Sequence, residues 1–256
     1  MLNILLVGCN GKMGRVITEL CRQNEQFRIV AGVDLFSENT AAFPVFTTIE
    51  ECREKPDVIV DFSRPSSLMS TLKFAVSYNV PAVIATTGHS PEQRELLKKA
   101  AASVPVFFSA NMSLGVAVVS HLVKRCAAVL GDDYDIEVIE RHHNQKVDAP
   151  SGTALMLADA AASSLSQQPV YTYERHSLHQ ARSKHEIGIS SIRGGTIVGD
   201  HEVLFAGVDE TISLHHNAQS RNVFAAGALR AACFVADKPA GMYNMDQLVE
   251  ETLTNF

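Results

Sequence analysis

The sequence predicts an α/β fold in which a doubly wound parallel sheet is interrupted by an inserted α+β domain. Short apolar runs alternate with longer amphipathic runs over the first half of the chain, as in a parallel sheet with helices on both faces. From Tyr134 onward, several strand-like runs accompany a single helical run, which is typical of a mixed or antiparallel sheet. The run 221–237 is helical again, which returns the chain to the first domain.

The strands of the first half are predicted from short apolar runs bounded by glycine, proline or polar residues. They cover residues 3–7, 27–34, 57–63, 81–88 and 104–110. The helices between them are predicted over residues 15–23, 65–78, 91–102 and 114–130. Two of these begin at a proline, which the first turn of a helix tolerates.

The second half begins with residues 134–143, which alternate apolar and polar side chains as a half-buried strand does. A helix is expected to begin near Ser151 and to cover one face of the sheet. Further strands are expected within residues 169–175, 186–207 and 209–218. The predicted domains are therefore 1–112 with 221–256, and an inserted domain at 113–220.

Composition and charge exclude several classes of protein. The net charge of -6 argues against a general nucleic-acid binder, but a small anionic substrate needs only local positive charge. The five cysteines are odd in number and form no C-x-x-C pair, so a disulfide framework is disfavoured and a cytoplasmic location is expected. No run approaches the ~18 consecutive apolar residues of a membrane span, so no membrane-spanning helix is expected.

The segment VGCNGKMGR places Gly8, Gly11 and Gly14 directly after the first predicted strand. Small residues let the backbone approach a pyrophosphate, and a helix beginning near Lys12 directs free N–H groups at that anion. Asp34 ends the second strand, where an acid accepts hydrogen bonds from an adenosine ribose. A glycine turn that binds nothing is the alternative, but the N-terminal position and the spacing to Asp34 favour a Rossmann-like dinucleotide-binding domain.

The residues after Asp34 bear on the choice of cofactor. Leu35 follows it, with Ser37 close by and no arginine next to the acid. A basic residue here would favour the 2′-phosphate of NADPH. Its absence favours NADH, although the use of both nucleotides stays open.

The segment ERHHNQKVDAPSGTAL gathers polar side chains at the predicted end of a strand. His142 and His143 would point to opposite faces of a regular strand, so both can serve one site only if the strand ends there, as the polar residues that follow predict. Lys146 adds a positive charge. The step Ser151, Gly152, Thr153 supplies hydroxyls and backbone N–H groups at a helix N-terminus, which is an anion site.

Three interpretations of this cluster compete. Histidines on the surface are the general expectation. A metal site is disfavoured, because no other histidine, cysteine or carboxylate completes a recognised ligand spacing. Acid–base chemistry fits best, because a histidine titrates near neutrality and can deliver a proton. With a nicotinamide cofactor, the cluster suggests hydride transfer to a small carboxylated substrate.

The run Glu140–Ala154 strongly resembles the signature of the dihydrodipicolinate reductase family, also called 4-hydroxy-tetrahydrodipicolinate reductases. The resemblance extends over essentially the whole chain through GCNGKMG, VDFSRP, ATTG, SANMSLG and GTIVGDHEVLFAG. It implies NAD(P)H-dependent reduction of 4-hydroxy-tetrahydrodipicolinate to tetrahydrodipicolinate in diaminopimelate and lysine biosynthesis. It also implies that the inserted domain binds the substrate and forms a homotetramer through its sheet.

The resemblance implies site residues by their matching positions. His142 matches the proton donor and Lys146 its catalytic partner. The positions that match substrate-binding residues are His143, Lys146, Ser151, Gly152, Thr153 and Thr87. Those that match dinucleotide-binding residues are Gly8, Gly11, Lys12, Met13, Gly14, Asp34, Phe62, Ser63, Thr86, Gly88, Ala110 and Met112. The chain departs from the pattern at Ala85, where the family often has glycine, and at Leu35.

Two other functions remain as alternatives. Another Rossmann-type dehydrogenase of a small amino or keto acid would keep the glycine loop, but it would not need H-H-x-x-K followed by S-G-T. A non-catalytic dinucleotide-sensing protein could dispense with a proton donor. The presence of both His142 and Lys146 argues against the sensing protein.

Overall fold

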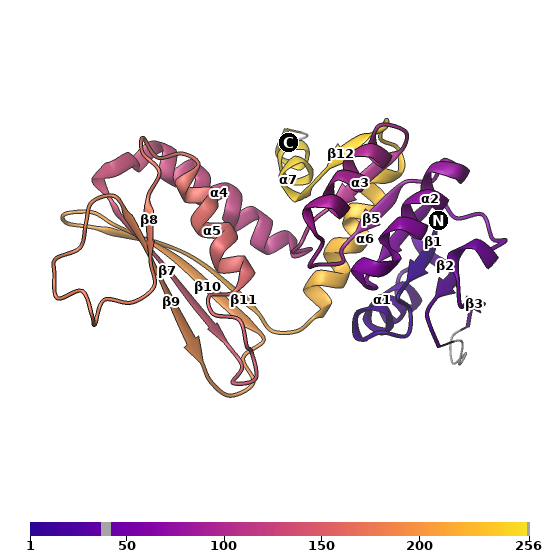
Figure 1. The fold of residues 1–256 in the computed structure, drawn as a ribbon, viewed down its shortest axis with the longest axis horizontal. Helices are drawn as coiled ribbons and strands as arrows, with labels where there is room; N and C mark the ends of the chain where they lie inside the picture. Colours follow the sequence, from indigo (N-terminus) through magenta and orange to yellow (C-terminus); the bar gives the residue numbers. More distant parts are fainter. Residues whose placement is uncertain (37–41, 255–256) are drawn as a thin grey trace. The chain divides into compact units, whose positions relative to one another are not determined.

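A computed structural model of the chain describes residues 1–36 and 42–254 (Figure 1). Ser37, which entered the cofactor argument, lies outside the described residues. The chain divides into two compact units. The first consists of Met1–Leu114 and Arg221–Phe256, and the second of Gly115–Ser220.

The first unit is built on a seven-stranded sheet in the order β12-β6-β5-β4-β1-β2-β3, in which neighbouring strands are parallel. The strands are β1 (Leu2–Val7), β2 (Phe27–Val33), β3 (Val45–Phe46), β4 (Val58–Asp61), β5 (Ala82–Ile84), β6 (Pro105–Phe108) and β12 (Gly241–Tyr243). The chain winds outward from β1 in one direction and from β4 in the other. The carboxyl ends of β1 and β4 therefore form the crevice where ligands bind in such sheets.

Helices cover both faces of this sheet, as expected for a doubly wound fold (Figure 1). They are α1 (Lys12–Arg22), α2 (Leu68–Tyr78), α3 (Pro91–Ala101), α6 (Asn222–Ala236) and α7 (Met245–Thr254). Side chains of α2 and α3, such as Leu72 and Leu97, share one core with Leu5 and Ile59 of the strands. Helix α1 packs against α6, which contacts β4, β5 and β6. The Rossmann-like prediction is thus confirmed.

Several boundaries differ from the sequence prediction. The run that begins at Pro65 opens with a 3₁₀ turn, Pro65–Ser67, and becomes α-helical at Leu68. Helix α1 begins at Lys12, as expected from the glycine loop, although the predicted helical run covered only residues 15–23. The sequence did not predict the short strands β3 and β12, because strands of two or three residues carry almost no periodic signal. It also did not predict the C-terminal helix α7.

The second unit contains a five-stranded mixed sheet in the order β11-β10-β7-β9-β8. Its strands are β7 (Asp135–His142), β8 (Val170–Thr172), β9 (Glu186–Arg193), β10 (Gly199–Ala206) and β11 (Thr211–Ala218). The central strand β7 pairs antiparallel with β10 and parallel with β9. The sequence left a mixed or an antiparallel sheet open, and the parallel pairs decide for the mixed one.

Two helices line the buried face of the second sheet. Helix α4 (Leu114–Leu130) contributes Val123 and Ala127, and α5 (Gly152–Ala162) contributes Leu157, to a core shared with Val138 and other strand residues. Helix α5 contacts β7, β9 and β10, so the expectation that a helix near Ser151 covers one face of the sheet is confirmed. On β7, Ile136, Val138, Glu140 and His142 are all buried.

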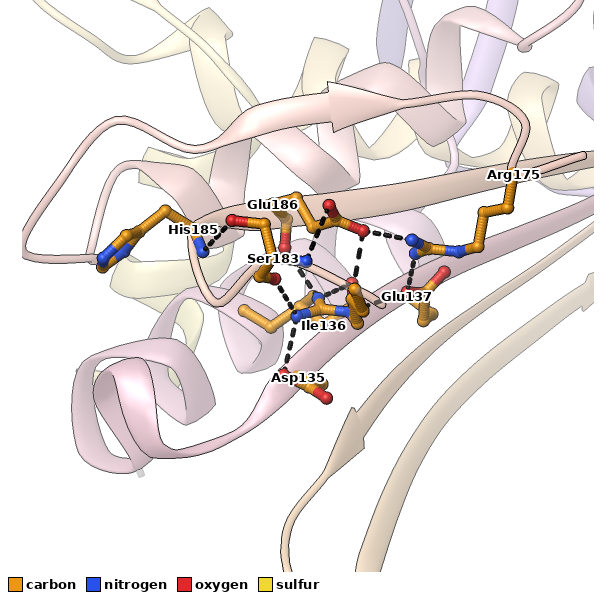
Figure 2. A network of polar contacts seen from close by, with 8 residues as sticks. Asp135, Ile136, Glu137, Arg175, Ser183, His185 and Glu186 are labelled. Atoms are coloured by element: carbon orange, nitrogen blue, oxygen red, sulfur yellow. Dashed lines mark hydrogen bonds and ion pairs between the residues drawn. The ribbon is translucent and has the colours of Figure 1, made fainter. Parts of the chain in front are cut away.

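The opposite face of the sheet carries charged side chains. Glu137 of β7 accepts hydrogen bonds from Arg175 and from Arg182 Nε, and Arg175 also pairs with Glu186 of β9 (Figure 2). A Cβ atom at Gly188 would lie 1.8 Å from Glu137 Oε2, so the glycine provides the space for this carboxylate. The network therefore fastens the loop between β8 and β9 to the sheet.

By length and composition alone, the helical run Leu114–Asp133 could cross a membrane, which the sequence reading did not anticipate. Lys124 and Arg125 interrupt the run, so it holds no long stretch of consecutive apolar residues. Its inner side, with Val123 and Ala127, is packed into the core of the second unit. The run is thus packed along its inner side only, with 28% of it buried.

Candidate active site

A cleft of about 850 Å³ opens at the carboxyl ends of the strands in the first unit. Its lining includes five of the residues expected to bind a dinucleotide, namely Gly8, Gly11, Asp34, Phe62 and Ser63. Arg15 and Arg64 also line it. The cleft therefore lies at the carboxyl ends of β1 and β4, the switch point of the sheet. It carries both acidic and basic side chains.

The glycine loop is shaped by close backbone contacts. Gly8 has φ +84°, and a Cβ there would lie 2.8 Å from the carbonyl oxygen of Phe62. A Cβ at Gly14 would lie 2.3 Å from the carbonyl oxygen of Gly8. Gly11 precedes α1 without a side-chain cap, which leaves the first N–H groups of the helix to a ligand. This cradle fits a pyrophosphate.

Asp34 takes part in the loop itself. Its Oδ2 accepts a hydrogen bond of 2.9 Å from the backbone N–H of Asn10. Asp34 lines the cleft, and a carboxylate can accept further hydrogen bonds, such as those a ribose would donate. Cys9 lies under the loop, and burial raises the pKa of its thiol to about 11, so this residue acts as packing.

The remaining residues expected to meet the dinucleotide do not line this cleft within the described parts of the chain. Lys12, Met13 and Gly14 lie in the first turn of α1, and Gly14 is buried there. Thr86 and Gly88 follow β5, with exposed Thr87 between them, and Ala110 and Met112 follow β6. Thr86 donates to the buried carboxylate of Asp61, a contact the sequence reading missed.

In the second unit, β7 ends at His142. The chain beyond it is held by the β9–β10 connection, because His143 N–H donates to Ile197 O and Gly194 N–H donates to His142 O. Lys146 Nζ lies 2.8 Å from Asp148 Oδ1. This contact keeps the pKa of Asp148 below its usual value.

Ser151 begins α5 as its N-cap. Its Oγ accepts a hydrogen bond of 3.1 Å from Ala154 N and lies 2.9 Å from His201 Nε2. Gly152 has open space around it, because a Cβ there would meet no atom within 4 Å. The N–H groups of this first turn can therefore receive an anion without steric hindrance.

His142 is held by a carboxylate. Its Nδ1 lies 2.6 Å from Oε2 of Glu140, whose side chain is 0% exposed. Glu140 also accepts hydrogen bonds from Ser151 N and from both terminal nitrogens of Arg193. Burial alone would raise the pKa of Glu140, but the donors led by Arg193 lower it to about 2, so Glu140 is a carboxylate at neutral pH.

A second histidine stands beside His142. The rings of His142 and His201 meet edge to face with centroids 5.1 Å apart. Burial, followed by the neighbouring His142, lowers the pKa of His201 to about 4, so His201 is neutral near pH 7.

Sequence reasoning missed Glu140, Arg193 and His201 as site residues. A signal for Glu140 was available, because residues two apart on a strand share a face and Glu140 stands two before His142. Arg193 and His201 come from other strands, and only the sheet register brings them near.

A cleft with a glycine loop at a parallel-sheet switch point, together with a second unit that carries a histidine, a lysine and an open helix N-terminus, is the arrangement expected of a two-domain nicotinamide-dependent oxidoreductase. Comparisons with known proteins agree. Residues 2–112 match the family model of the dihydrodipicolinate reductase N-terminus, and residues 115–249 match that of its C-terminus. The chain belongs to the dihydrodipicolinate reductase family.

Relatives named 4-hydroxy-tetrahydrodipicolinate reductase support this assignment. The protein of Clostridium tetani is 51% identical over 246 residues, which is 96% of each chain, and that of Clostridium novyi is 46% identical over 98% of this chain and 99% of its own. A dipicolinate-bound dihydrodipicolinate reductase from Paenisporosarcina sp. TG-14 has a TM-score of 0.79 at 26% identity, covering 95% of this chain and 97% of its own.

The same fold recurs in other dehydrogenases. A myo-inositol dehydrogenase from Corynebacterium glutamicum has a TM-score of 0.63 at 17% identity, covering 100% of this chain and 95% of its own. At that identity the likeness concerns the fold alone. The substrate must therefore be argued from the residues of the second unit.

Proposed function

We propose that this chain reduces 4-hydroxy-tetrahydrodipicolinate to tetrahydrodipicolinate with NAD(P)H, in diaminopimelate and lysine biosynthesis. The observation that carries the proposal is a group of three features on the segment that starts where β7 ends, the first and the last of them joined through hydrogen bonds to Glu140. These are the imidazole of His142, the ammonium of Lys146 and the first turn of α5. A cyclic dicarboxylate needs a proton donor and anion-binding groups, and these features supply both.

The anion-binding part rests on the N-terminus of α5. Ser151, Gly152 and Thr153 are proposed to receive a substrate carboxylate through backbone N–H groups and hydroxyls, and the open space around Gly152 admits it. Lys146 and His143 add positive or hydrogen-bonding groups. The dipicolinate bound to the structural neighbour is itself a dicarboxylate, which supports this class of substrate.

The proton-donating part rests on His142. Its Nδ1 is engaged by Glu140, so Nε2 is the nitrogen from which a proton can leave. When bound, reduced nicotinamide supplies the hydride of the reaction. The 4-hydroxyl group leaves as water with a hydrogen from the adjacent ring carbon, which gives the conjugated ring that accepts the hydride. His142 then supplies the proton to the electron-rich ring carbon that results, and Lys146 keeps the carboxylates oriented. General acid catalysis of this kind typically contributes ~10²–10⁴-fold in rate.

The first unit is proposed to hold the dinucleotide through the cleft-lining residues named above, with NADH preferred. Asp34 offers a carboxylate to a ribose, and Leu35 offers no charge to a 2′-phosphate. Arg15 and Arg64 line the same cleft and offer positive charge to the phosphates of either nucleotide. The ratio of NADH and NADPH rates is therefore the direct test of this preference.

A homotetramer formed through the second unit is also proposed. Helices α4 and α5 cover one face of its sheet, while the face with Glu137 has no helix over it among the described residues. Sedimentation velocity of the purified chain tests this, because a monomer at micromolar concentration contradicts it.

The test of the reaction is a coupled assay. The substrate is generated from pyruvate and aspartate semialdehyde by its synthase, and the oxidation of NADH and of NADPH is followed separately. Oxidation that requires the synthase supports the proposal. A folded chain that oxidises neither nucleotide refutes it and favours a dinucleotide-sensing protein.

Variants assign the roles. His142→Gln should lower kcat with little change in substrate binding, and Lys146→Ala should impair both. His176→Gln is the matched control, because this histidine is exposed on the β8–β9 loop and should leave the kinetics unchanged. Wild-type kinetics in both His142→Gln and Lys146→Ala would remove these residues from the site.

A further inference from the structure

We propose that Glu140 is a positioning residue, resting on the function proposed above, which holds His142 in the Nδ1–H tautomer and directs Nε2 to the substrate. Glu140 touches no reacting atom in this proposal. It acts only through the imidazole.

The contact follows from the strand geometry. Glu140 and His142 are two residues apart on β7, so both side chains project to the same face, the one that α5 covers. The Nδ1 to Oε2 distance is 2.6 Å, and the two side chains are 10% and 0% exposed. Water therefore has little access to this hydrogen bond, and in such a site it is stronger than on a surface.

Glu140 is itself fixed on several sides. Arg193 of β9 donates from Nη1 to Oε2 and from Nη2 to Oε1, each at 2.7 Å, and Ser151 N donates to Oε1 at 3.1 Å. Bidentate arginine–carboxylate pairs have a set geometry. The carboxylate therefore cannot rotate away from His142 without breaking contacts to a neighbouring strand and to the start of α5.

The arrangement determines the tautomer. Every partner of Glu140 named above donates, and an ionised carboxylate can only accept. Nδ1 of His142 must therefore carry a hydrogen in the neutral as well as the protonated ring. When the protonated ring releases the Nε2 hydrogen to the substrate carbon, a C–H bond forms, an N–H bond breaks, and the neutral Nδ1–H tautomer remains.

The other groups around His142 are compatible with this role. Arg193 on β9 is turned to Glu140, and His201 on β10 is neutral near pH 7 because burial lowers its pKa to about 4. Ser151 at the start of α5 bonds His201. A Cβ at Gly199 would lie 3.3 Å from Nε2 of His142, a tight contact that the glycine avoids.

Arg193 also connects Glu140 to the segment that carries Lys146. Its Nη2 donates to the carbonyl oxygen of Asp148 at 2.6 Å, and Asp148 in turn pairs with Lys146. One carboxylate thus organises the proton donor and, through Arg193, the loop that carries the lysine.

The first experiment needs no variant. The protein is labelled with ¹⁵N in histidine, and imidazole two-bond correlation spectra are recorded above neutral pH, with the His142→Gln spectrum assigning the His142 signals among ten histidines. The expected result is Nδ1–H with an unprotonated Nε2. A neutral His142 with hydrogen on Nε2 overturns the proposal.

The second experiment is kinetic. Glu140→Gln keeps the shape of the side chain and removes its charge, so kcat should fall about 10–100-fold, the scale on which removing the orienting partner of a functional histidine acts. The substrate KM should change little. The alkaline limb of the kcat profile should move to lower pH, because the variant removes a negative charge beside the imidazole.

A matched control separates positioning from stability. Glu186→Gln removes another nearly buried carboxylate from an arginine pair in the same sheet, at the opposite end of β9 from Arg193 (Figure 2). It should lower the unfolding free energy without moving the pH profile. An unchanged profile in Glu140→Gln, or an equal shift in Glu186→Gln, overturns the proposal.

Two further measurements decide the proposal if the variant does not fold or the wild-type protein is inactive. If Glu140→Gln does not fold because Arg193 is left unpaired, the double variant Glu140→Gln, Arg193→Gln removes both charges and is assayed in its place. If the wild-type protein oxidises neither nucleotide, the proposed reaction has failed, whereas the tautomer measured in that same protein still decides the role of Glu140.

Discussion

His201 should make the stability of the protein depend on pH. Its side chain is 4% exposed, and burial, followed by the neighbouring His142, lowers its pKa from 6.5 to about 4. Between these two pH values the unfolded chain binds a proton that the folded chain does not. The stability is therefore fully present above pH 6.5 and is lost progressively as the pH falls toward 4.

The magnitude follows from the same two values. Each pH unit within this window lowers the unfolding free energy by about 1.4 kcal/mol per histidine of this kind. His201 should therefore account for about 2 kcal/mol of lost stability at pH 5 and about 3 kcal/mol at pH 4. Against a typical total of about 5–15 kcal/mol for a domain, such a loss is readily measured.

The assay is urea unfolding of the wild type and of His201→Gln at pH 7.5 and at pH 5, at one fixed protein concentration. The glutamine side chain can hydrogen-bond to Ser151 Oγ, as His201 does in the wild type, but it does not titrate. The pKa of His216 is also lowered by burial, but its contribution is common to both proteins and cancels in the difference. Equal losses of stability in wild type and variant would refute the reasoning.

Three further outcomes are expected. Gly8→Ala should lower the unfolding free energy by about 1–3 kcal/mol, because the added Cβ would lie 2.8 Å from Phe62 O. It should also weaken NADH binding, as measured by calorimetric titration. The control Gly131→Ala should leave NADH binding intact, because Gly131 shares a positive φ but a Cβ there meets no atom within 4 Å. Leu157→Ala, at a site 1% exposed, should cost about 2–5 kcal/mol in urea unfolding, whereas Val129→Ala, at a site 84% exposed, should change it by less than about 0.5 kcal/mol. Burial raises the thiol pKa values of Cys9 and Cys21 to about 11, so both should resist iodoacetamide at pH 8 in the folded protein. Exposed Cys233 should react. Equal labelling of the three cysteines in peptide mass spectrometry would contradict this.

The sequence predicted the principal strands and helices because their side-chain periods are long enough to read. Residues 4–7 of β1, 29–33 of β2 and 58–60 of β4 are continuous apolar stretches, and β7 alternates polar and apolar residues from Asp135 to Val138. Helix α7 was missed, although a signal exists. Asn244 and Gln247 form a reciprocal capping pair, with Gln247 N donating to Asn244 Oδ1 and Asn244 N donating to Gln247 Oε1.

The functional site was predictable only where it is local in sequence. The glycine loop and the segment from His142 to Thr153 lie within short windows, so motif spacing is enough to find them. The partners of Glu140 are not local, because Arg193 reaches it only through the pairing of β7 with β9. Likewise, Arg64 joins Arg15 in the cleft only because β4 lies beside β1.

Gly188 and Glu137 restrict each other's evolution. Any side chain at position 188 would occupy the space of the Glu137 carboxylate, so it would displace that carboxylate and leave Glu186 as the partner of Arg175 and Arg182. Glycine at 188 is tolerable without Glu137, but Glu137 in this orientation is not tolerable without the glycine. Substitutions at this pair should therefore accumulate in a fixed order, with position 137 changing before position 188.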